Sequence, residues 1–241
     1  MKNQPTISVR GLPLGTAGTA APLEFDTHEG EVLAVIGDNG TGKSVLLSIL
    51  SGILRPAGGS VRVFGSDLFD LRQRKIAQSE IGVVLQQAAL LRNLTVFENV
   101  ALPFLAKGLA LEKDLEKRVM LRLRLVGCAH LAHSEVRRLS EGDRRCIALV
   151  RALAGRNRLL IADEPAASLA PGKKALVEEL LATLVRTGAL ATIVLATQDL
   201  DFARRIATRF LILHADGSPT FLRNDEIAGN ESFTTFARSA A

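Results

Sequence analysis

The pattern of apolar and polar positions divides the chain into short, continuous apolar runs separated by longer segments with helical spacing. Apolar runs rich in branched residues and bounded by turn residues are typical of strands buried on both faces of a parallel sheet. Such runs predict strands at 31–36, 81–85, 159–162, 191–196 and 210–213, and alternation of apolar and polar residues predicts further strands at 7–10 and 60–64. Helices are predicted at 45–50, 144–154 and 173–185.

A long segment from Ala88 to Arg138 has a different pattern, in which apolar residues recur three or four positions apart. One amphipathic helical face contains Leu115, Val119, Leu123 and Val126. Strands alternating with helices imply a mostly parallel α/β sheet covered on both faces, and the helical segment is an insertion in it. We therefore expect one domain, 1–241, with a core lobe formed by 1–87 and 144–241 and a helical lobe at 88–143.

Composition narrows the class of protein. Apolar residues make up 47% and charged residues 23% of 241 residues, which indicates a globular chain. The net charge of +5 is spread without a dense Lys/Arg tract, and the chain has no Tyr or Trp for base stacking, so nucleic-acid binding is disfavoured. No apolar run reaches the roughly 18 residues of a transmembrane helix, so we expect no direct membrane span. Cys128 and Cys146 lack metal-type spacing and are expected to be buried free thiols.

The clearest chemical signal follows the strand predicted at 31–36. The pattern G-x-x-x-x-G-K-[ST] of a phosphate-binding loop is matched by Gly37, Asp38, Asn39, Gly40, Thr41, Gly42, Lys43 and Ser44. Glycines let the backbone N–H groups point inward at phosphate oxygens, and a helix begins there. Lys43 would bridge the β- and γ-phosphates, and the Ser44 hydroxyl would bind Mg²⁺. The alternative is a chance glycine-rich turn, which the agreement of pattern and context disfavours.

Two carboxylates end the apolar strand predicted at 159–162. Ligands of open α/β sheets bind outside the carboxyl ends of the strands, so Asp163 would lie beside the phosphate loop and hold Mg²⁺, directly or through water. Glu164 would orient or deprotonate the attacking water. Mg²⁺ and Lys43 would supply the positive charge that two adjacent carboxylates need. Asp-Glu after an apolar run can also simply start a loop or cap a helix.

Over nearly all its length the chain resembles the ATPase subunit of an ABC transporter. Gln86 follows the strand at 81–85, where that family has a glutamine loop, and residues 139–143 (Leu-Ser-Glu-Gly-Asp) partly match its leucine-serine-glycine-glycine-glutamine signature. The resemblance implies a P-loop NTPase core with a mostly parallel sheet, an N-terminal antiparallel β part and an inserted α-helical subdomain. It also implies catalytic roles for Lys43, Gln86, Glu164 and Gln198, Mg²⁺ contact by Gln86, and nucleotide contact by Ser140 and Gly142.

The same resemblance implies the cofactors and the partners. In this family two ATPase subunits dimerise head to tail with ATP and Mg²⁺ between them, and a groove receives a short helix of a membrane-spanning permease. Residues 87–103 are similar to ATPases of bacterial phospholipid traffic, and 161–165 are also similar to the lipoprotein-releasing and cell-division branches. We therefore expect a subunit at the cytoplasmic face of a bacterial inner membrane, working on lipid or other hydrophobic cargo.

Residues 139–143 allow two interpretations. A serine hydroxyl and glycine N–H groups at a helix start form an anion site suited to a γ-phosphate. The same residues also form a plain helix cap, with Ser140 as the N-cap residue and Glu141 and Asp143 favouring the helix dipole. Both interpretations predict the same local geometry, so the sequence leaves them open.

Several positions depart from the family pattern. Glu141 replaces the first signature glycine and places a carboxylate near a triphosphate, and Asp143 replaces the glutamine. Residues 168–170 lack the usual aspartate, Gln198 stands at the switch histidine, and 10–20 contain no aromatic residue to stack on adenine. Gln198 can donate a hydrogen bond but cannot carry positive charge. We therefore expect Mg-ATP binding with turnover that is reduced or dependent on a partner subunit.

Two other functional classes stay open at this point. One is a nucleotide-binding regulatory or scaffold subunit that hydrolyses little ATP itself. The other is a soluble ABC-type ATPase that acts on nucleic acid, which tandem cassettes or a basic, aromatic-rich extension would favour. The sequence contains neither of those features.

Overall fold

The computed structural model describes residues 4–14, 22–85, 89–106, 108, 112–155, 157–227, 230 and 233. Gln86, part of the region without aromatic residues at 10–20, and most of the residues after 227 lie outside this part of the chain. The statements below concern the described residues.

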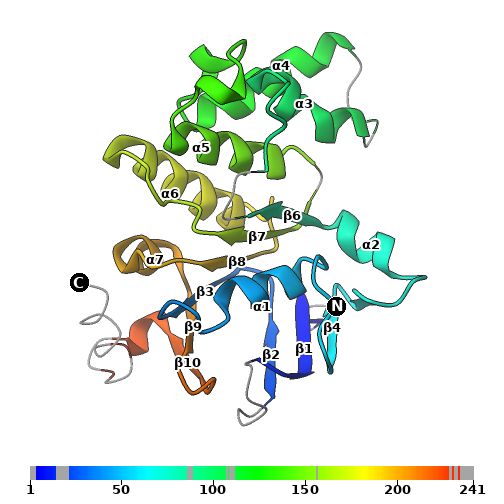
Figure 1. Ribbon diagram of the computed structural model, residues 1–241, viewed down its shortest axis with the longest axis vertical. Helices are drawn as coiled ribbons and strands as arrows, with labels where there is room; N and C mark the ends of the chain where they lie inside the picture. The colour runs from blue at the N-terminus through cyan, green and yellow to red at the C-terminus, as the bar shows by residue number, and fades with distance from the viewer. Residues whose placement is uncertain are drawn as a thin grey trace.

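The centre of the molecule is a six-stranded sheet (Figure 1). Its strands occur in the order β10 (Pro219–Arg223), β9 (Arg209–Leu213), β3 (Glu31–Gly37), β8 (Thr192–Ala196), β7 (Leu159–Asp163) and β6 (Ile81–Val84). All neighbouring pairs are parallel except β10 with β9. The expected mostly parallel sheet is confirmed. β10 was not predicted, since its apolar residues are few and it begins at a proline.

A smaller antiparallel sheet lies beside the first one. Its strands occur in the order β2 (Leu23–Thr27), β1 (Ile7–Leu12), β4 (Ser60–Val63) and β5 (Ser66–Asp67). This confirms the antiparallel β part that the family resemblance implied. The pattern analysis itself missed β2 and β5, which have five and two residues and so give little periodicity.

Helices cover both faces of the large sheet. They are α1 (Lys43–Leu50), α2 (Arg74–Ser79), α3 (Val96–Ala106), α4 (Glu112–Leu125), α5 (Glu141–Ala152), α6 (Pro171–Arg186) and α7 (Leu200–Ile206), with 3₁₀ turns at Ala129–Leu131, Val136–Arg138 and Asn224–Glu226. The prediction for α5 began at 144, three residues late, because the N-cap residue Ser140 starts the helix earlier. α2 and α7 were missed because they span less than two turns each.

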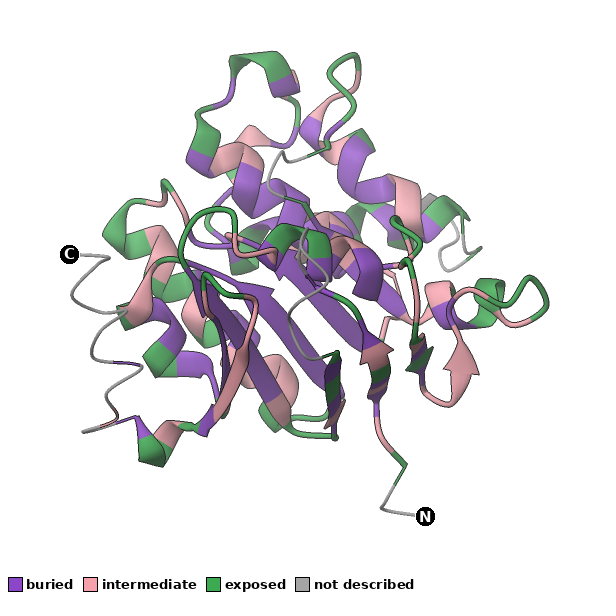
Figure 2. Cartoon of the chain, turned by 60° about the horizontal axis from the view of Figure 1, so that its bottom comes forward, coloured by how far each residue is buried: buried purple, intermediate pink, exposed green. Residues whose placement is uncertain are grey.

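Strand β3 shows why its sequence is apolar throughout. Val32, Ala34 and Ile36 pack into a core cluster with helices α3 to α7, whereas Leu33 and Val35 pack into a second cluster with α1 and the antiparallel sheet. Figure 2 shows the buried strands enclosed between these layers. Burial on both faces removes every position from Val32 to Gly37 from water, which is what a continuous apolar run requires.

The inserted helical segment contributes its apolar face to the first cluster. Leu115, Val119, Leu123 and Val126 are all buried, as the helical spacing predicted. Helix α5 packs against α3, α4 and strand β6, and α4 also contacts α6 (Figure 1). The division into lobes at 88 and 143 stays a prediction, since α5 touches elements on both sides of that boundary. Cys128 and Cys146 are buried free thiols.

No helix in the described ranges has both the length and the apolar character that crossing a membrane requires.

Candidate functional site

The phosphate-binding loop connects the end of β3 with the start of α1. Gly37 has φ 152°, and a Cβ atom there would lie 2.4 Å from the main-chain oxygen of Leu213 on the neighbouring strand. Gly42 is the N-cap residue of α1, with φ 95° in the left-handed region. Only glycine combines that backbone conformation with so close an approach to another strand. The local sequence thus forms a loop that ends at a helix N-terminus, the geometry that favours anions.

Lys43 lies buried inside this loop. Its Nζ donates to the main-chain oxygens of Gly37 at 2.6 Å and Asp38 at 2.7 Å. Burial lowers the pKa of Lys43, and the carboxylates of Glu164, Asp163 and Asp38 oppose that effect. The ammonium group is therefore held at the loop, close enough to the acidic strand end to feel its charges, and its contact with a triphosphate stays a prediction.

Asp163 lies at the end of β7, and β8 is the only strand between it and β3. The sheet register places Asp163 level with Ala196 and Ala196 level with Val35, two residues before Gly37. The Asp163 side chain is buried and makes no hydrogen bond or ion pair with any described residue. A buried carboxylate without such a partner fits Mg²⁺, and Ser44, the last residue of the phosphate loop, would supply a hydroxyl oxygen.

Glu164 turns away from the strand in a left-handed backbone conformation, with φ 50°. Its carboxylate accepts hydrogen bonds from Oγ1 of Thr197 at 3.0 Å and from the main-chain nitrogen of Gln198 at 2.9 Å. Burial raises the pKa of Glu164, although these two hydrogen bonds favour its charged form. Among the described residues this side chain caps no helix, whereas Glu164 does begin a loop, in which its main-chain oxygen accepts from the nitrogen of Ala167 at 3.3 Å. A raised pKa suits a group that takes up a proton from water.

Gln198 connects the strand-end residues to the phosphate loop. Its Nε2 donates to Oδ1 of Asn39 at 2.7 Å, and its main-chain nitrogen donates to Glu164. Both Gln198 and Asn39 are exposed. The structure thus brings together Lys43, Asp163, Glu164 and Gln198 at the carboxyl ends of β3, β7 and β8.

The N-terminus of α5 has the capping geometry that the sequence allowed. Oγ of Ser140 accepts from the main-chain nitrogen of Asp143 at 3.1 Å and donates to Oδ2 of Asp143 at 2.6 Å. Asp143 also forms an ion pair with Lys173, and Glu141 pairs with Arg145 at 3.0 Å. Among the described residues, neither Ser140 nor Gly142 makes a hydrogen bond with the loop 37–44. Nucleotide contact by these two residues stays a prediction.

Gly142 is buried against the loop that follows the acidic strand end. A Cβ atom at Gly142 would lie 2.8 Å from the main-chain oxygen of Ser168, a residue with φ 61°. The signature region and the loop at 165–170 therefore touch within one chain, although residues 168–170 lack the family aspartate.

Gln86 lies outside the described residues, so its catalytic and metal-binding roles also stay predictions.

Sequence reasoning overlooked Arg145. It is buried on α5 and donates to the main-chain oxygen of Glu164. A charged residue on the apolar face of a helix was the signal that could have identified it.

Sequence comparison with known proteins points to the same class of nucleotide-binding protein as the phosphate loop and the acidic strand end. The family model described as "ABC transporter" matches residues 20–167, more than half of the chain. The lipoprotein-releasing system ATP-binding protein LolD of Ruegeria sp. (strain TM1040) is 37% identical over 212 residues, covering 83% of this chain and 92% of the relative. The methionine import ATP-binding protein MetN 2 of Pseudomonas entomophila (strain L48) is 34% identical over 196 residues, or 80% of this chain. The chain spans 58% of that methionine import relative.

Solved structures share the whole architecture. The ATP-binding cassette MJ0796, described as a dimer in a post-hydrolysis state bound to ADP and Pi, has a TM-score of 0.82 and 27% identity over 90% of this chain and 98% of its own. A structure described as the ATP binding subunit of an ABC transporter has a TM-score of 0.83 and 25% identity, with 98% and 99% covered. The family match, the lipoprotein-releasing relative and the phosphate loop with its acidic strand end all agree. The chain belongs to the ABC transporter ATP-binding family.

Proposed function

We propose that this chain binds Mg-ATP and hydrolyses it. The observation that carries the proposal is that Lys43 donates to Gly37 at 2.6 Å, while Gln198 donates both to Asn39 of the glycine-rich loop at 2.7 Å and to Glu164 at 2.9 Å. A loop of backbone amides with one ammonium group fits a triphosphate, and a buried carboxylate beside it fits the accompanying metal ion.

Each residue has a role that its position supports. Lys43 would bridge the β- and γ-phosphates, and Ser44 and Asp163 would hold Mg²⁺, which neutralises charge that develops on the phosphate oxygens. Glu164 would accept a proton from the attacking water, since burial raises its pKa. Gln198 would donate its amide hydrogen bond to the γ-phosphate in place of Asn39.

Nucleotide titration of paired lysine variants tests this proposal. We expect Lys43→Ala to abolish binding of a fluorescent ATP analogue in the presence of Mg²⁺ and to abolish phosphate release. The matched control is Lys75→Ala, which removes an exposed lysine of α2 and is expected to bind and turn over like the unaltered protein. Unchanged nucleotide binding by Lys43→Ala would refute the site.

We further propose that two ATPase subunits, identical or different, close head to tail, so that Ser140 and Gly142 contact the nucleotide of the partner. Support comes from the dimeric state given for MJ0796 and from the helix N-terminus at Ser140, which favours anions. A protein with Glu164→Gln, held with Mg-ATP, is expected to elute as a dimer in size-exclusion chromatography. A monomer under conditions where ATP is bound would contradict the head-to-tail site.

We propose a transmembrane permease as the second partner, with the chain at the cytoplasmic face of a bacterial inner membrane. The docking surface would lie near Gln86 to Pro103. Leu85 and Leu91 are exposed apolar side chains on either side of the undescribed residues 86–88, and exposed apolar patches favour protein contacts. Replacing both with glutamine is expected to prevent co-purification with the permease while nucleotide binding is retained.

For the cargo we propose a lipid or lipid-bearing substrate. The supporting observation is that the lipoprotein-releasing relative matches over 92% of its length, whereas the methionine import relative matches over 58%. Amino-acid import is the competing assignment. Proteoliposomes containing the permease and this subunit separate the two, because ATP-dependent release of a lipoprotein supports the first and ATP-dependent methionine uptake supports the second.

A regulatory subunit with little hydrolysis of its own is the second candidate function. One observation favours it: the Ser140 hydroxyl is engaged by Asp143, and Glu141 adds a negative charge at the same helix start. Turnover measured with and without the permease and a second ATPase subunit distinguishes the candidates, since a regulatory subunit stays slow in both cases.

A further inference from the structure

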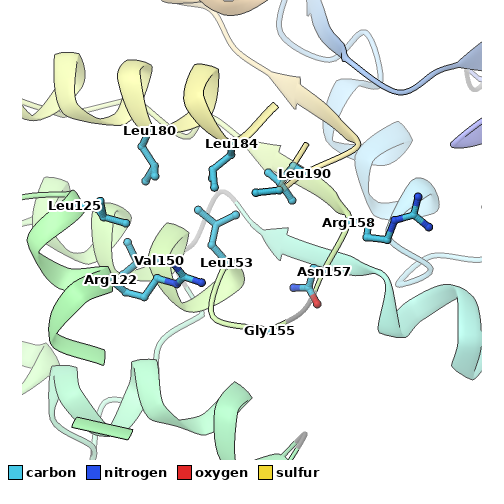
Figure 3. A pocket seen from close by; sticks show the side chains of 11 residues that line it. Arg122, Leu125, Val150, Leu153, Gly155, Asn157, Arg158, Leu180, Leu184 and Leu190 are labelled. Carbon is cyan, nitrogen blue, oxygen red and sulfur yellow. The ribbon is translucent and has the colours of Figure 1, made fainter. Parts of the chain in front are cut away.

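A cavity of about 310 Å³ lies between α4, α5 and α6 (Figure 3), and no residue of the phosphate loop lines it. Aliphatic side chains make up most of its wall, and they come from α4, α5, α6 and the segment before β8: Leu125, Val150, Leu153, Leu180, Leu184, Ala189 and Leu190. None of them belongs to the nucleotide site. The volume falls at the lower end of pockets that hold small ligands, which span about 300–1,000 Å³.

One cationic side chain, that of Arg122, extends from α4 into this apolar space toward Leu153 (Figure 3). Its Nε is buried and has no hydrogen-bond partner, and Arg122 forms no ion pair with any described residue. Burial lowers the pKa of Arg122, and the neighbouring cation Arg118 acts in the same direction. A guanidinium group in apolar surroundings is costly unless an anion meets it.

The other polar groups of the wall are already engaged and supply no anion. Arg158 pairs with Glu29 at 2.9 Å and lies over the ring of Phe64, away from the cavity. Asn157 donates to the main-chain oxygen of Ala152 at 2.6 Å. Among the described residues, the lining side chains therefore present aliphatic surface and one cation, Arg122, that no anion meets.

We propose that this cavity binds a single-chain anionic amphiphile, with a carboxylate or phosphate head on Arg122 and an aliphatic tail along Leu153 and the leucines of α6. A guanidinium group donates two parallel hydrogen bonds to such a head, and these are among the stronger hydrogen bonds in proteins. The tail gains by leaving water at about 25 cal/mol per Å² of apolar surface. A neutral or cationic head would leave the charge of Arg122 without a partner.

The cavity is lined by no residue of the phosphate loop, and it lies where the inserted helical segment meets the core. It joins α4 of the inserted segment to α6 of the core, and α5 extends from it to Ser140. An occupant would therefore fix the inserted helices relative to α6. Binding does not depend on nucleotide, so Lys43→Ala is expected to retain it.

Calorimetric titration of the full chain tests the proposal with four probes of equal chain length: decanoate, decyl phosphate, decanol and decyltrimethylammonium, each below its micelle concentration. We expect one site for at least one of the two anions, with binding at least tenfold weaker for decanol and for the cation. Comparison of decanoate with decyl phosphate identifies the preferred head. Equal binding of all four probes, or of none, would overturn the proposal. An acidic, leucine-rich helical peptide is titrated as a fifth probe, and tighter binding of that peptide than of either anion would also overturn it.

Variants locate the site. Arg122→Gln is expected to weaken anion binding at least tenfold, whereas Arg124→Gln, an exposed arginine two residues away on α4, is expected to bind like the unaltered protein. Ala189→Trp fills the cavity while leaving Arg122 in place, so it decides the question if Arg122→Gln does not fold. Unchanged anion binding in either cavity variant, or an equal loss in Arg124→Gln, would refute the assignment.

Discussion

The main-chain nitrogen of Gln198 donates to Oε1 of Glu164 at 2.9 Å, so the loop after β8 holds the carboxylate proposed as the base. The side chain of the same Gln198 reaches Asn39 in the phosphate loop. Gln198 thus contacts both the proposed base and the loop where the γ-phosphate would bind, and Thr197 also donates to Glu164. Movement of the loop at 197–199 would therefore change the contacts of Glu164 and of Asn39 at the same time.

Glu164→Gln is expected to keep nucleotide binding and to lower turnover by about 10²–10⁴-fold, the usual effect of losing a general base. The amide oxygen can still accept from Gln198, so the loop is expected to stay in place. Phosphate release at saturating Mg-ATP measures the effect, and binding of a fluorescent ATP analogue serves as the control. Turnover within a few-fold of the unaltered protein would exclude Glu164 as the base.

The pH dependence of turnover follows from the raised pKa of Glu164. A base works in its ionised form, and burial keeps Glu164 protonated to a higher pH than an ordinary glutamate, whose pKa is about 4.3. Turnover at saturating nucleotide is therefore expected to fall on acidification before pH 4.3 is reached and to be retained on the alkaline side. The residual activity of Glu164→Gln is expected to lack this acidic limb, and an identical limb in both proteins would assign it to another group.

The parts of the proposed nucleotide site differ in how far the sequence could predict them. The phosphate loop and the acidic strand end follow from local patterns, since glycine, lysine and carboxylate positions are fixed along the chain. The contact between Gln198 and Asn39 depends on β8 lying between β3 and β7, and strand order is not written in any local pattern. Arg145 could have been identified from its place on the apolar face of α5, but its contact with the main-chain oxygen of Glu164 joins two elements and follows from no local pattern.

Gln198 is expected to contribute through its amide donor. Gln198→Ala removes that donor and the contact with Asn39, and we expect turnover to fall about tenfold, which corresponds to about 1.4 kcal/mol. Gln198→His restores a donor that can also carry positive charge, so its turnover is expected to equal or exceed that of the unaltered protein. Steady-state rates of the three proteins provide the comparison, and an alanine variant as active as the histidine variant would remove Gln198 from the mechanism.

Glu141 is expected to slow turnover in the dimer, because its carboxylate lies at the helix start proposed to face the partner's triphosphate. Glu141→Gln removes the charge without adding a glycine to the helix, and we expect a lower KM for ATP and a several-fold higher rate. Glu179→Gln, an exposed change on α6, is the matched control. A rate unchanged from the unaltered protein would show that Glu141 does not approach the nucleotide.

The ion pair between Lys173 and Asp143 joins the start of α6 to the start of α5, and its removal is expected to destabilise the protein. Burial opposes ionisation of Asp143, but Lys173 and the Ser140 hydroxyl outweigh it and hold the pKa of Asp143 below its usual range. We expect Lys173→Met to lower the free energy of unfolding at pH 7 by about 1.5–3 kcal/mol, the range for a hydrogen bond to a charged group. Lys117→Met, at an exposed position of α4, serves as the control.

The sign of the pH effect on that ion pair follows from the lowered pKa. Stabilisation by an ionised carboxylate is fully present above its unfolded-state pKa of about 3.9 and is lost as the pH falls through the lower folded-state value. The stability difference between the unaltered protein and Lys173→Met is therefore expected to be constant from pH 7 to about pH 5 and to shrink below about pH 4. Urea unfolding at pH 7, 5 and 3 measures it, and a difference that persists undiminished at pH 3 would attribute the loss to packing of the lysine stem instead of its charge.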